Sequence, residues 1–412
     1  MNCLQRKNGI IQFGTTSAKD LIEEYGSPLY IYSEEKIRKK CRQIKEICSL
    51  PNMQAYYSAK ANSSVAILRI IREEGLFVDA MSLGEVYLEK LAGYATDEIL
   101  FVSNNVQKKD FQELISQNIR VCIDSISQLK LYCSLHPKSK ISIRINPGKG
   151  DGHHENVITA GKVKFGIEIS CIEKAFDIAK EFGCEITGLH SHIGSLFLSS
   201  EIFLESVSVL LDLAKKYPQI DFLDFGGGFG IPYNRSNEEA FPIESFTKQF
   251  INKLQQWMEE TGRVPSFAIE PGRFVVAEAG ICLTTVQSVK SNSGIRFVGT
   301  DLGFNFLLRP QLYDSYHEII HATNDDNSNL EKVTVVGNVC ESGDNLGTDR
   351  MLPKIVDGDV LLIRDTGAYG MSMASNYNSM KRPAELLIGT DGKVTLIRKR
   401  ETFEDLSRNQ VY

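Results

Sequence analysis

The chain has 412 residues, of which 42% are hydrophobic and 24% charged, and its formal net charge is −6. This is an ordinary globular composition, long enough for two domains, and without a block of like charge it argues against nucleic acid or an anionic membrane as partner. No apolar run is long enough to cross a bilayer, the first residues lack an apolar signal core, and nine scattered cysteines form no CxxC motif, so we expect reduced thiols and a cytoplasmic protein.

The first two-thirds of the chain repeat one pattern. Residues 9–33 predict one strand and a lead-in helix, and from residue 54 short β-branched or aromatic runs alternate with longer helical stretches. Such alternation predicts a parallel sheet, and eight units suffice for a closed (β/α)8 TIM-like barrel over residues 28–275, with an open doubly wound sheet as the alternative. The predicted strands are 54–58, 76–80, 98–103, 119–124, 140–145, 185–192, 220–225 and 266–270.

The pattern changes after residue 275. Six strand-like runs follow without long helices between them, separated by turn signals such as Ser291–Gly294 and Asp391–Gly392. Residues 276–412, together with 1–27, are therefore expected to form a second, mostly antiparallel β-domain.

Residues able to do chemistry collect at the predicted strand ends. A barrel carries its active site at the carboxyl ends of its strands. Lys60 follows the first strand in "YYSAKAN", where a solvated surface lysine is the plain alternative. His190 and His192 close the sixth strand, and "GGGFG" (226–230) and "EPGR" (270–273) follow the seventh and eighth.

The last loops predict a phosphate site. Gly226, Gly227 and Gly228 let backbone N–H groups approach an anion, and Arg273 adds a fixed cation. Ser195 offers a hydroxyl from the neighbouring loop. A lone glycine triplet is usually only a turn, but two such motifs in adjacent loops favour phosphate.

A lysine, a glutamate and a histidine facing a phosphate site together suit pyridoxal 5'-phosphate. Lys60 supplies an amine that can condense with the cofactor's aldehyde, Glu270 an anion for the pyridine nitrogen, and His192 a flat ring to stack on it.

The rival interpretation is a metal site, because His190-x-His192 resembles a ligand pair of hydrolase barrels and His153-His154 lie nearby. The fifth and eighth strands lack the further ligands that such a site needs, so we expect no metal. We interpret His190 as structural and His153 and His154 as loop residues at the substrate entrance.

Eight motifs in order along both predicted domains resemble the diaminopimelate decarboxylases, alanine-racemase-type pyridoxal-phosphate enzymes of fold type III. The motifs are "YYSAKAN", "VDAMSLGE", "HSHIGS", "DFGGGFGIPY", "EPGR", "NFLLRPQLY", "VVGNVCESGDNLG" and "DTGAYGMSMASNYN". The resemblance implies a barrel plus β-domain and a homodimer with active sites shared between subunits.

The resemblance also assigns roles to residues. Cys340 is expected to be the proton donor, arriving from the partner subunit. The cofactor would be held by Lys60, Gly228, Glu270, Gly272, Arg273 and Tyr369. The substrate would be bound by Arg273, Arg309, Tyr313, Glu341 and Tyr369.

The implied reaction is decarboxylation of meso-2,6-diaminopimelate to L-lysine and CO2, the last step of lysine biosynthesis. Arg273 and Arg309 suit the carboxylates of such a substrate, and Glu341 suits its distal ammonium. The alternatives are a decarboxylase of D-lysine, D-ornithine or another basic amino acid, and a catalytically silent relative that binds pyridoxal phosphate. Asp79 and Arg144 are further residues that could face the cofactor.

Overall fold

The computed structural model describes residues 5–152 and 154–411 of the chain. It divides into two compact units. The barrel unit consists of Lys39–Pro232 and Glu239–Val275, and the β-unit of Tyr233–Glu238 together with the described residues before Lys39 and from Val276 onward. The domain limits expected from the sequence stay a prediction.

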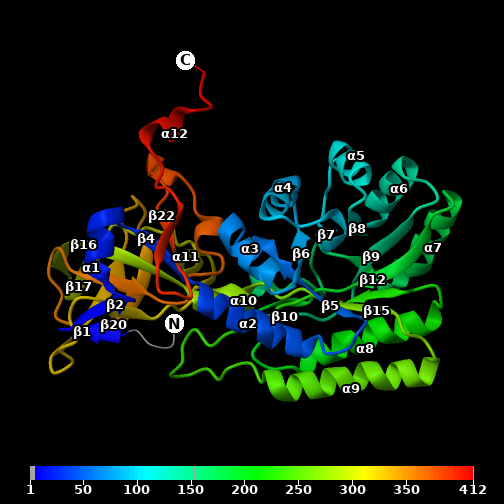
Figure 1. Cartoon of the computed structure of the whole chain (residues 1–412), viewed down its shortest axis with the longest axis horizontal. Coiled ribbons are helices and arrows are strands. Elements are labelled where there is room, and N and C mark those ends of the chain that lie inside the picture. The colour runs from blue at the N-terminus through cyan, green and yellow to red at the C-terminus, as the bar shows by residue number, and fades with distance from the viewer. Residues whose placement is uncertain (1–4, 153, 412) are drawn as a thin grey trace. The chain divides into compact units, whose positions relative to one another are not determined.

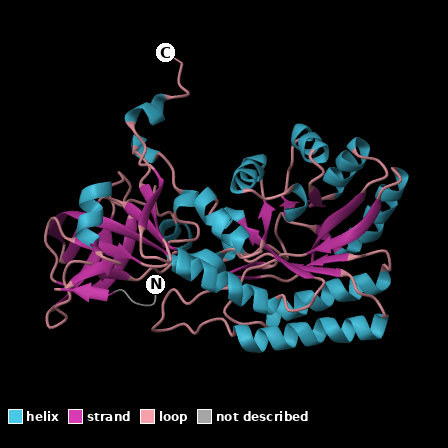
Figure 2. Ribbon diagram, viewed as in Figure 1, coloured by secondary structure: helices cyan, strands magenta, loops and turns pink. Residues whose placement is uncertain are grey.

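Eight parallel strands of the barrel unit close into a barrel, because the last strand pairs with the first and every other strand with its successor. The closed order confirms the predicted (β/α)8 barrel over an open sheet. Figures 1 and 2 show its strands and helices. The strands are β5 (Met53–Ser58), β6 (Phe77–Ala80), β7 (Ile99–Val102), β8 (Arg120–Ile123), β9 (Lys140–Asn146), β12 (Glu185–His190), β14 (Phe222–Asp224) and β15 (Ser266–Ile269).

A helix follows each barrel strand. α3 buries its apolar residues Ile67, Leu68 and Ile71, as the 3.6-residue spacing predicts. α4 begins at Ser82, whose side chain accepts a hydrogen bond from the N–H of Glu85. The helices are α3 (Val65–Glu73), α4 (Leu83–Ala92), α5 (Lys108–Ser116), α6 (Ile126–Leu135), α7 (Ile172–Glu181), α8 (Glu201–Lys216), α9 (Ile243–Thr261) and the short α10 (Arg273–Val276).

The barrel is filled by side chains rather than open. Tyr56, Leu100, Cys122, Phe222 and Ala268 come from different strands and form one buried cluster. Because this core supports the strands from inside, the loops at their carboxyl ends start from fixed positions.

The β-unit is a mostly antiparallel sheet, as expected. Its order is β20-β19-β17-β16-β4-β22-β23, and only the β4–β22 and β17–β19 pairs on this path are parallel. The strands are β4 (Leu29–Ser33), β16 (Gly280–Asn292), β17 (Ile295–Thr300), β18 (Ile319–His321), β19 (Leu330–Val336), β20 (Asn345–Pro353), β21 (Val360–Ile363), β22 (Ala384–Ile388) and β23 (Val394–Arg398).

Three features of the β-unit differ from the prediction. Residues 9–33 hold more than one strand, since β2 (Ile10–Phe13), β3 (Thr16–Ser17) and β4 all fall there with α1 (Ala18–Tyr25). β18 and β20 were also not expected, because their sequences lack a regular apolar alternation.

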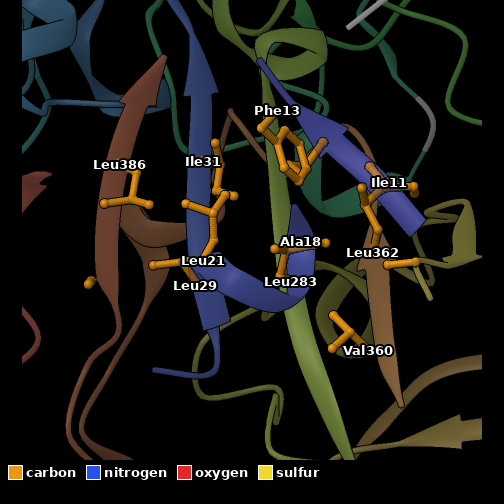
Figure 3. Close-up of a cluster of buried hydrophobic side chains, with 13 residues drawn as sticks. Ile11, Phe13, Ala18, Leu21, Leu29, Ile31, Leu283, Val360, Leu362 and Leu386 are labelled. Carbon is orange, nitrogen blue, oxygen red and sulfur yellow. The ribbon is translucent and has the colours of Figure 1, made fainter. Parts of the chain in front are cut away.

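Figure 3 shows the buried core beneath α1, in which Leu21 packs with Leu29, Ile31 and Leu386.

Two further observations concern the helices and the cysteines. Among the described residues, no helix combines the length and apolar character needed to cross a membrane. The eight described cysteines, all except Cys3, are free thiols, and Cys340 is the exposed one among them.

Candidate active site

Lys60 lies where the first barrel strand ends. It sits in the 3-10 turn η1 (Ala59–Ala61) directly after β5 and is half-buried. Ser58 fixes this end: its hydroxyl donates to Oδ2 of Asp79 at 2.7 Å, and its N–H donates to the carbonyl of Pro271 at 3.1 Å. The Lys60 charge influences the pKa values of Glu270 and His192, so its amine belongs to the same cluster as these side chains.

His192 follows the sixth strand and is held as a neutral ring. Its Nδ1 accepts a hydrogen bond from the N–H of Gly227 at 3.1 Å. Burial, together with the charges of Lys60 and Arg144, lowers its pKa well below the usual value. Since Nδ1 is the acceptor, the ring proton is on Nε2.

Glu270 ends the eighth strand as a buried anion. Its Oε2 lies 3.1 Å from Nε2 of His190, and both side chains are 1% exposed. Burial by itself would raise the pKa of Glu270, but His190 and Lys60 lower it to about 2. Oε1 of Glu270 has no hydrogen-bond partner among the described residues and can therefore accept a hydrogen bond from a ligand.

Asp224, at the end of the seventh strand, connects this carboxylate to the glycine triplet. Its Oδ1 accepts from the N–H of Gly226 at 2.9 Å, and the N–H of Glu270 donates to the Gly226 carbonyl at the same distance. Burial and the Glu270 charge raise the pKa of Asp224 well above its usual value, so the charged form of Asp224 is disfavoured beside Glu270.

The glycine triplet leaves no room for side chains. A Cβ on Gly226 would lie 2.4 Å from the carbonyl oxygen of Ser191, and one on Gly227 only 1.8 Å from that of Glu270. A Cβ on Gly228, whose φ is +116°, would lie 2.1 Å from Cε1 of Phe197. Only glycine allows this backbone to pass so close to its neighbours.

Arg273 and Ser195 meet beside the triplet. Nη2 of Arg273 donates to Oγ of Ser195 at 2.9 Å, and Arg273 is 5% exposed. Gly272 brings this loop against the first strand, since a Cβ there would lie 3.0 Å from Cβ of Ser58. The predicted barrel residues therefore gather at one end of the barrel.

These residues fit pyridoxal phosphate. The structure supplies a half-buried amine, a buried anion with an oxygen still able to accept a hydrogen bond, a neutral imidazole, and a glycine turn beside a guanidinium and a hydroxyl. These groups match the aldehyde, the ring nitrogen, the ring face and the phosphate of that cofactor.

The metal alternative involves a different set from the one predicted. His190, Asp224 and Glu270 have ligand atoms within 4.8 Å of one another, and His192 is not in this group. His154 caps η3 (Glu155–Val157) by accepting from the N–H of Asn156, whereas His153 lies outside the described residues.

Four barrel residues make more hydrogen bonds to other site residues than the sequence suggested. His190 and Asp224 contact Glu270 and the triplet directly, although His190 was interpreted as structural and Asp224 was not considered. Arg144 donates a hydrogen bond to the carbonyl of His192 at 3.3 Å, and Asp79 accepts a hydrogen bond from the Ser58 hydroxyl. Their position at or near strand ends was the available signal.

Cys340 and Glu341 share one neighbouring segment in the β-unit. Sγ of Cys340 lies 3.2 Å from Nδ2 and 3.4 Å from Oδ1 of Asn378. Oε1 of Glu341 accepts from the Tyr377 hydroxyl at 2.6 Å. Both predicted residues are exposed on this unit.

Arg309 occupies a different environment. It begins α11 (Arg309–Tyr313) and is fully buried. Its guanidinium contacts Nε2 of His317 at 3.0 Å and Oγ of Ser315 at 3.1 Å, and lies 4.4 Å from the ring centre of Tyr233. Tyr313 ends the same helix, half-buried.

Tyr369 lies in the turn after β21 with a left-handed φ of 56° and is half-buried. The turn is tight, because a Cβ on Gly367 would lie 1.9 Å from the carbonyl oxygen of Val276.

Comparison with known proteins gives one consistent answer. Residues 34–277 match the family described as "Pyridoxal-dependent decarboxylase, pyridoxal binding domain". The diaminopimelate decarboxylase of Methanothermobacter thermautotrophicus is 42% identical over 98% of this chain and 96% of its own length.

Solved structures agree. The crystal structure of diaminopimelate decarboxylase from M. jannaschii has a TM-score of 0.89 and 33% identity, covering 99% of this chain and 97% of that one. The Helicobacter pylori enzyme complexed with L-lysine has a TM-score of 0.86 and 33% identity, covering 95% and 98%.

Proposed function

The chain belongs to the diaminopimelate decarboxylase family of pyridoxal-dependent decarboxylases, and from that premise we propose that it converts meso-2,6-diaminopimelate to L-lysine and CO2. The observation that carries the proposal is the cluster of Lys60, His192 and Glu270 beside the glycine triplet. The reaction removes the carboxylate from one amino-acid end of the substrate and leaves the other end intact. We also place the protein in the cytoplasm, where the free thiols of the described cysteines would stay reduced.

We assign the cofactor to the barrel unit. When bound, pyridoxal phosphate supplies an electron sink for the bond that loses CO2. Lys60 would hold the aldehyde end, and the ionised Glu270 would keep a proton on the ring nitrogen. The neutral imidazole of His192 would face the ring without competing for that proton, because its Nδ1 already accepts a hydrogen bond from Gly227.

The phosphate end is assigned to the last loops. Gly226, Gly227 and Gly228 offer N–H groups, and Arg273 and Ser195 offer a cation and a hydroxyl. Gly272 keeps Arg273 close to the strand end. Tyr369 is proposed to contact both the cofactor and the substrate.

The β-unit is proposed to complete the site for the substrate. Arg273 and Arg309 would receive carboxylates, with Tyr313 beside them, and Glu341 the distal ammonium. Cys340 would give a proton to the carbon that has lost CO2.

We propose a homodimer in which Cys340 and Glu341 of one subunit serve the barrel of the partner. Both residues are exposed on their own unit, and a proton donor has to reach the reacting carbon. Sedimentation and mixing of Lys60→Ala with Cys340→Ala subunits test this. An equimolar mixture should regain up to about a quarter of wild-type activity, because about half of its dimers are mixed and one of the two sites in each mixed dimer then has both residues.

A substrate panel tests the reaction. Purified full-length protein with pyridoxal phosphate should release CO2 from meso-2,6-diaminopimelate and form L-lysine. Turnover of D-lysine or D-ornithine with diaminopimelate untouched would instead support a decarboxylase of basic amino acids. If no substrate is turned over, the result would support a catalytically silent relative. Lys60→Ala should lose the visible absorbance of bound cofactor and all activity, whereas Lys108→Ala, a change at an exposed residue of α5, should keep both.

A further inference from the structure

We propose that the dipeptide Tyr377-Asn378 positions the proton donor and the carboxylate that binds the distal ammonium of the substrate: Asn378 holds Cys340 before and after it gives up its proton, and Tyr377 holds Glu341. The inference rests on the roles of Cys340 and Glu341 under the proposed function and adds two residues to them.

The contacts pair the two segments residue by residue. Asn378 presents its amide to Sγ of Cys340, with Nδ2 at 3.2 Å and Oδ1 at 3.4 Å. One residue away in each segment, the Tyr377 hydroxyl donates to Glu341 at 2.6 Å. All four residues lie in the β-unit, so each subunit would carry the pairing intact wherever Cys340 acts.

The backbone at Asn378 is set for this contact. Its φ is 56° and its ψ 24°, in the left-handed region, where asparagine, aspartate and glycine are tolerated best. Tyr377 is held by its ring, which stacks on Phe304 at 5.7 Å between ring centres. The dipeptide is thus fixed by features other than the polar contacts it makes.

An amide is the group that suits a thiol which must change charge. Before transfer, the S–H of Cys340 can donate to Oδ1 of Asn378. In the transfer the S–H bond breaks, a C–H bond forms on the carbon that has lost CO2, and the electron pair of the S–H bond stays on sulfur. The N–H of Asn378 then faces the thiolate as a donor until solvent returns a proton.

The charges around Cys340 make this support necessary. Glu341 follows it in sequence, and the phenol of Tyr377 lies close by, with its pKa raised by the hydrogen bond to Glu341. A carboxylate next to a forming thiolate disfavours it, and the amide donor offsets part of that cost. The Tyr377 hydroxyl donates a short hydrogen bond to the Glu341 carboxylate and so stabilises its negative charge.

Asn378→Asp and Asn378→Gly test the first half, since both residues tolerate the left-handed backbone. Aspartate removes the donor and adds a charge, so the pH midpoint for iodoacetamide labelling of Cys340, followed by mass spectrometry, should rise by about one unit. The kcat should fall about tenfold, and less than one lysine should form per CO2 released. Glycine should lower the lysine yield without adding a charge.

Tyr377→Phe tests the second half. It should raise KM for diaminopimelate about tenfold or more, the effect of one lost hydrogen bond to a charged group, with kcat and lysine yield unchanged. The control is Asn118→Asp, which changes an exposed left-handed asparagine (φ 53°) after helix α5 and should leave every readout as in wild type.

The outcomes separate the inference from its premise. If Cys340→Ala still gives one lysine per CO2, the donor assignment is wrong and the Asn378 role falls with it. If Cys340→Ala lowers the yield while both Asn378 variants label and react like wild type, only the Asn378 role is overturned. An unchanged KM in Tyr377→Phe overturns the role of that residue.

Discussion

Nε2 of His190 lies 3.1 Å from Oε2 of Glu270, in contact between two side chains that are each 1% exposed. A carboxylate in such surroundings would ordinarily take up a proton, since burial disfavours its charge. His190 and the Lys60 charge reverse this and lower the pKa of Glu270 to about 2. His190 thereby acts on the carboxylate that we assign to the cofactor ring.

Replacing His190 with leucine should make catalysis dependent on pH where the wild type is not. Without its partner, the buried Glu270 should take up a proton at a much higher pH. We expect kcat at pH 7 to fall 10- to 100-fold, to recover as the pH rises, and pyridoxal phosphate to bind more weakly by equilibrium dialysis. His190→Gln keeps a donor and should retain most activity. A leucine variant whose pH profile matches the wild type would show that Glu270 does not need this partner.

The glycine triplet yields a steric prediction. In Gly227→Ala the new Cβ would lie 1.8 Å from the carbonyl oxygen of Glu270, so one of the two loops has to move. Overpacking of this kind costs about 1–3 kcal/mol of unfolding free energy, and urea unfolding should show it. The cofactor affinity should fall as well, because the displaced loops carry Glu270 and the proposed phosphate groups.

Gly84→Ala is the matched control. Gly84 lies in helix α4, where the nearest heavy atom to a new Cβ, Oγ of Ser82, is 3.5 Å away. Alanine favours a helix over glycine by about 0.5–1 kcal/mol, so this variant should be as stable as wild type or more so. An equal loss of unfolding free energy in Gly227→Ala and Gly84→Ala would mean that any added methyl group disturbs the barrel.

The barrel was predictable because its signal is local. Buried parallel strands are continuous runs of β-branched and aromatic residues, and each run from "QAYYS" to "SFAIE" lies on an observed strand. β18 and β20 were missed because their own sequences lack the alternation; β18 is set by pairing with β21, more than 35 residues further on, and β20 by irregular pairing with the preceding strand β19.

The site was predictable residue by residue but not in its contacts. Lys60 and Glu270 follow strands and belong to recognisable motifs. The pairing of His190 with Glu270 joins residues 80 positions apart, and that of Cys340 with Asn378 joins residues 38 apart. Such contacts depend on how strand ends and turns meet in space, which no local pattern reports.

The burial of Glu89 should make the free energy of unfolding depend on pH. It lies inside α4, fully buried, and neither carboxylate oxygen has a hydrogen-bond partner among the described residues. Burial, with the charges of Asp79 and Glu85, raises its pKa to about 9. The folded chain therefore holds a proton that the unfolded chain releases near pH 4.3, and stability falls by about 1.4 kcal/mol per pH unit between those values.

Glu89→Gln should remove that slope. The variant is expected to be more stable than wild type by about 2 kcal/mol at pH 7, below the full linkage value because local relaxation lowers the cost. The gain should grow toward pH 9 and vanish near pH 4. Urea unfolding at several pH values measures it, and Glu73→Gln, near the end of α3, serves as the control. A gain that does not depend on pH would mean that Glu89 is already ionised in the folded chain.

Arg309 is the residue at which stability and substrate binding have to be separated. Its guanidinium is fully buried, contacts Ser315 and His317, and lies over the face of Tyr233. Lysine keeps the charge but cannot reproduce these planar contacts, so Arg309→Lys should lose about 3 kcal/mol of unfolding free energy. Ser315→Ala removes one of the same contacts without changing any charge and should lose about 1 kcal/mol with KM unaltered. If Arg309 also receives a carboxylate of diaminopimelate, Arg309→Lys should raise KM well beyond the Ser315 variant at a temperature where both remain folded. Equal KM values in the two variants would leave Arg309 a structural role in the β-unit and remove it from the substrate site.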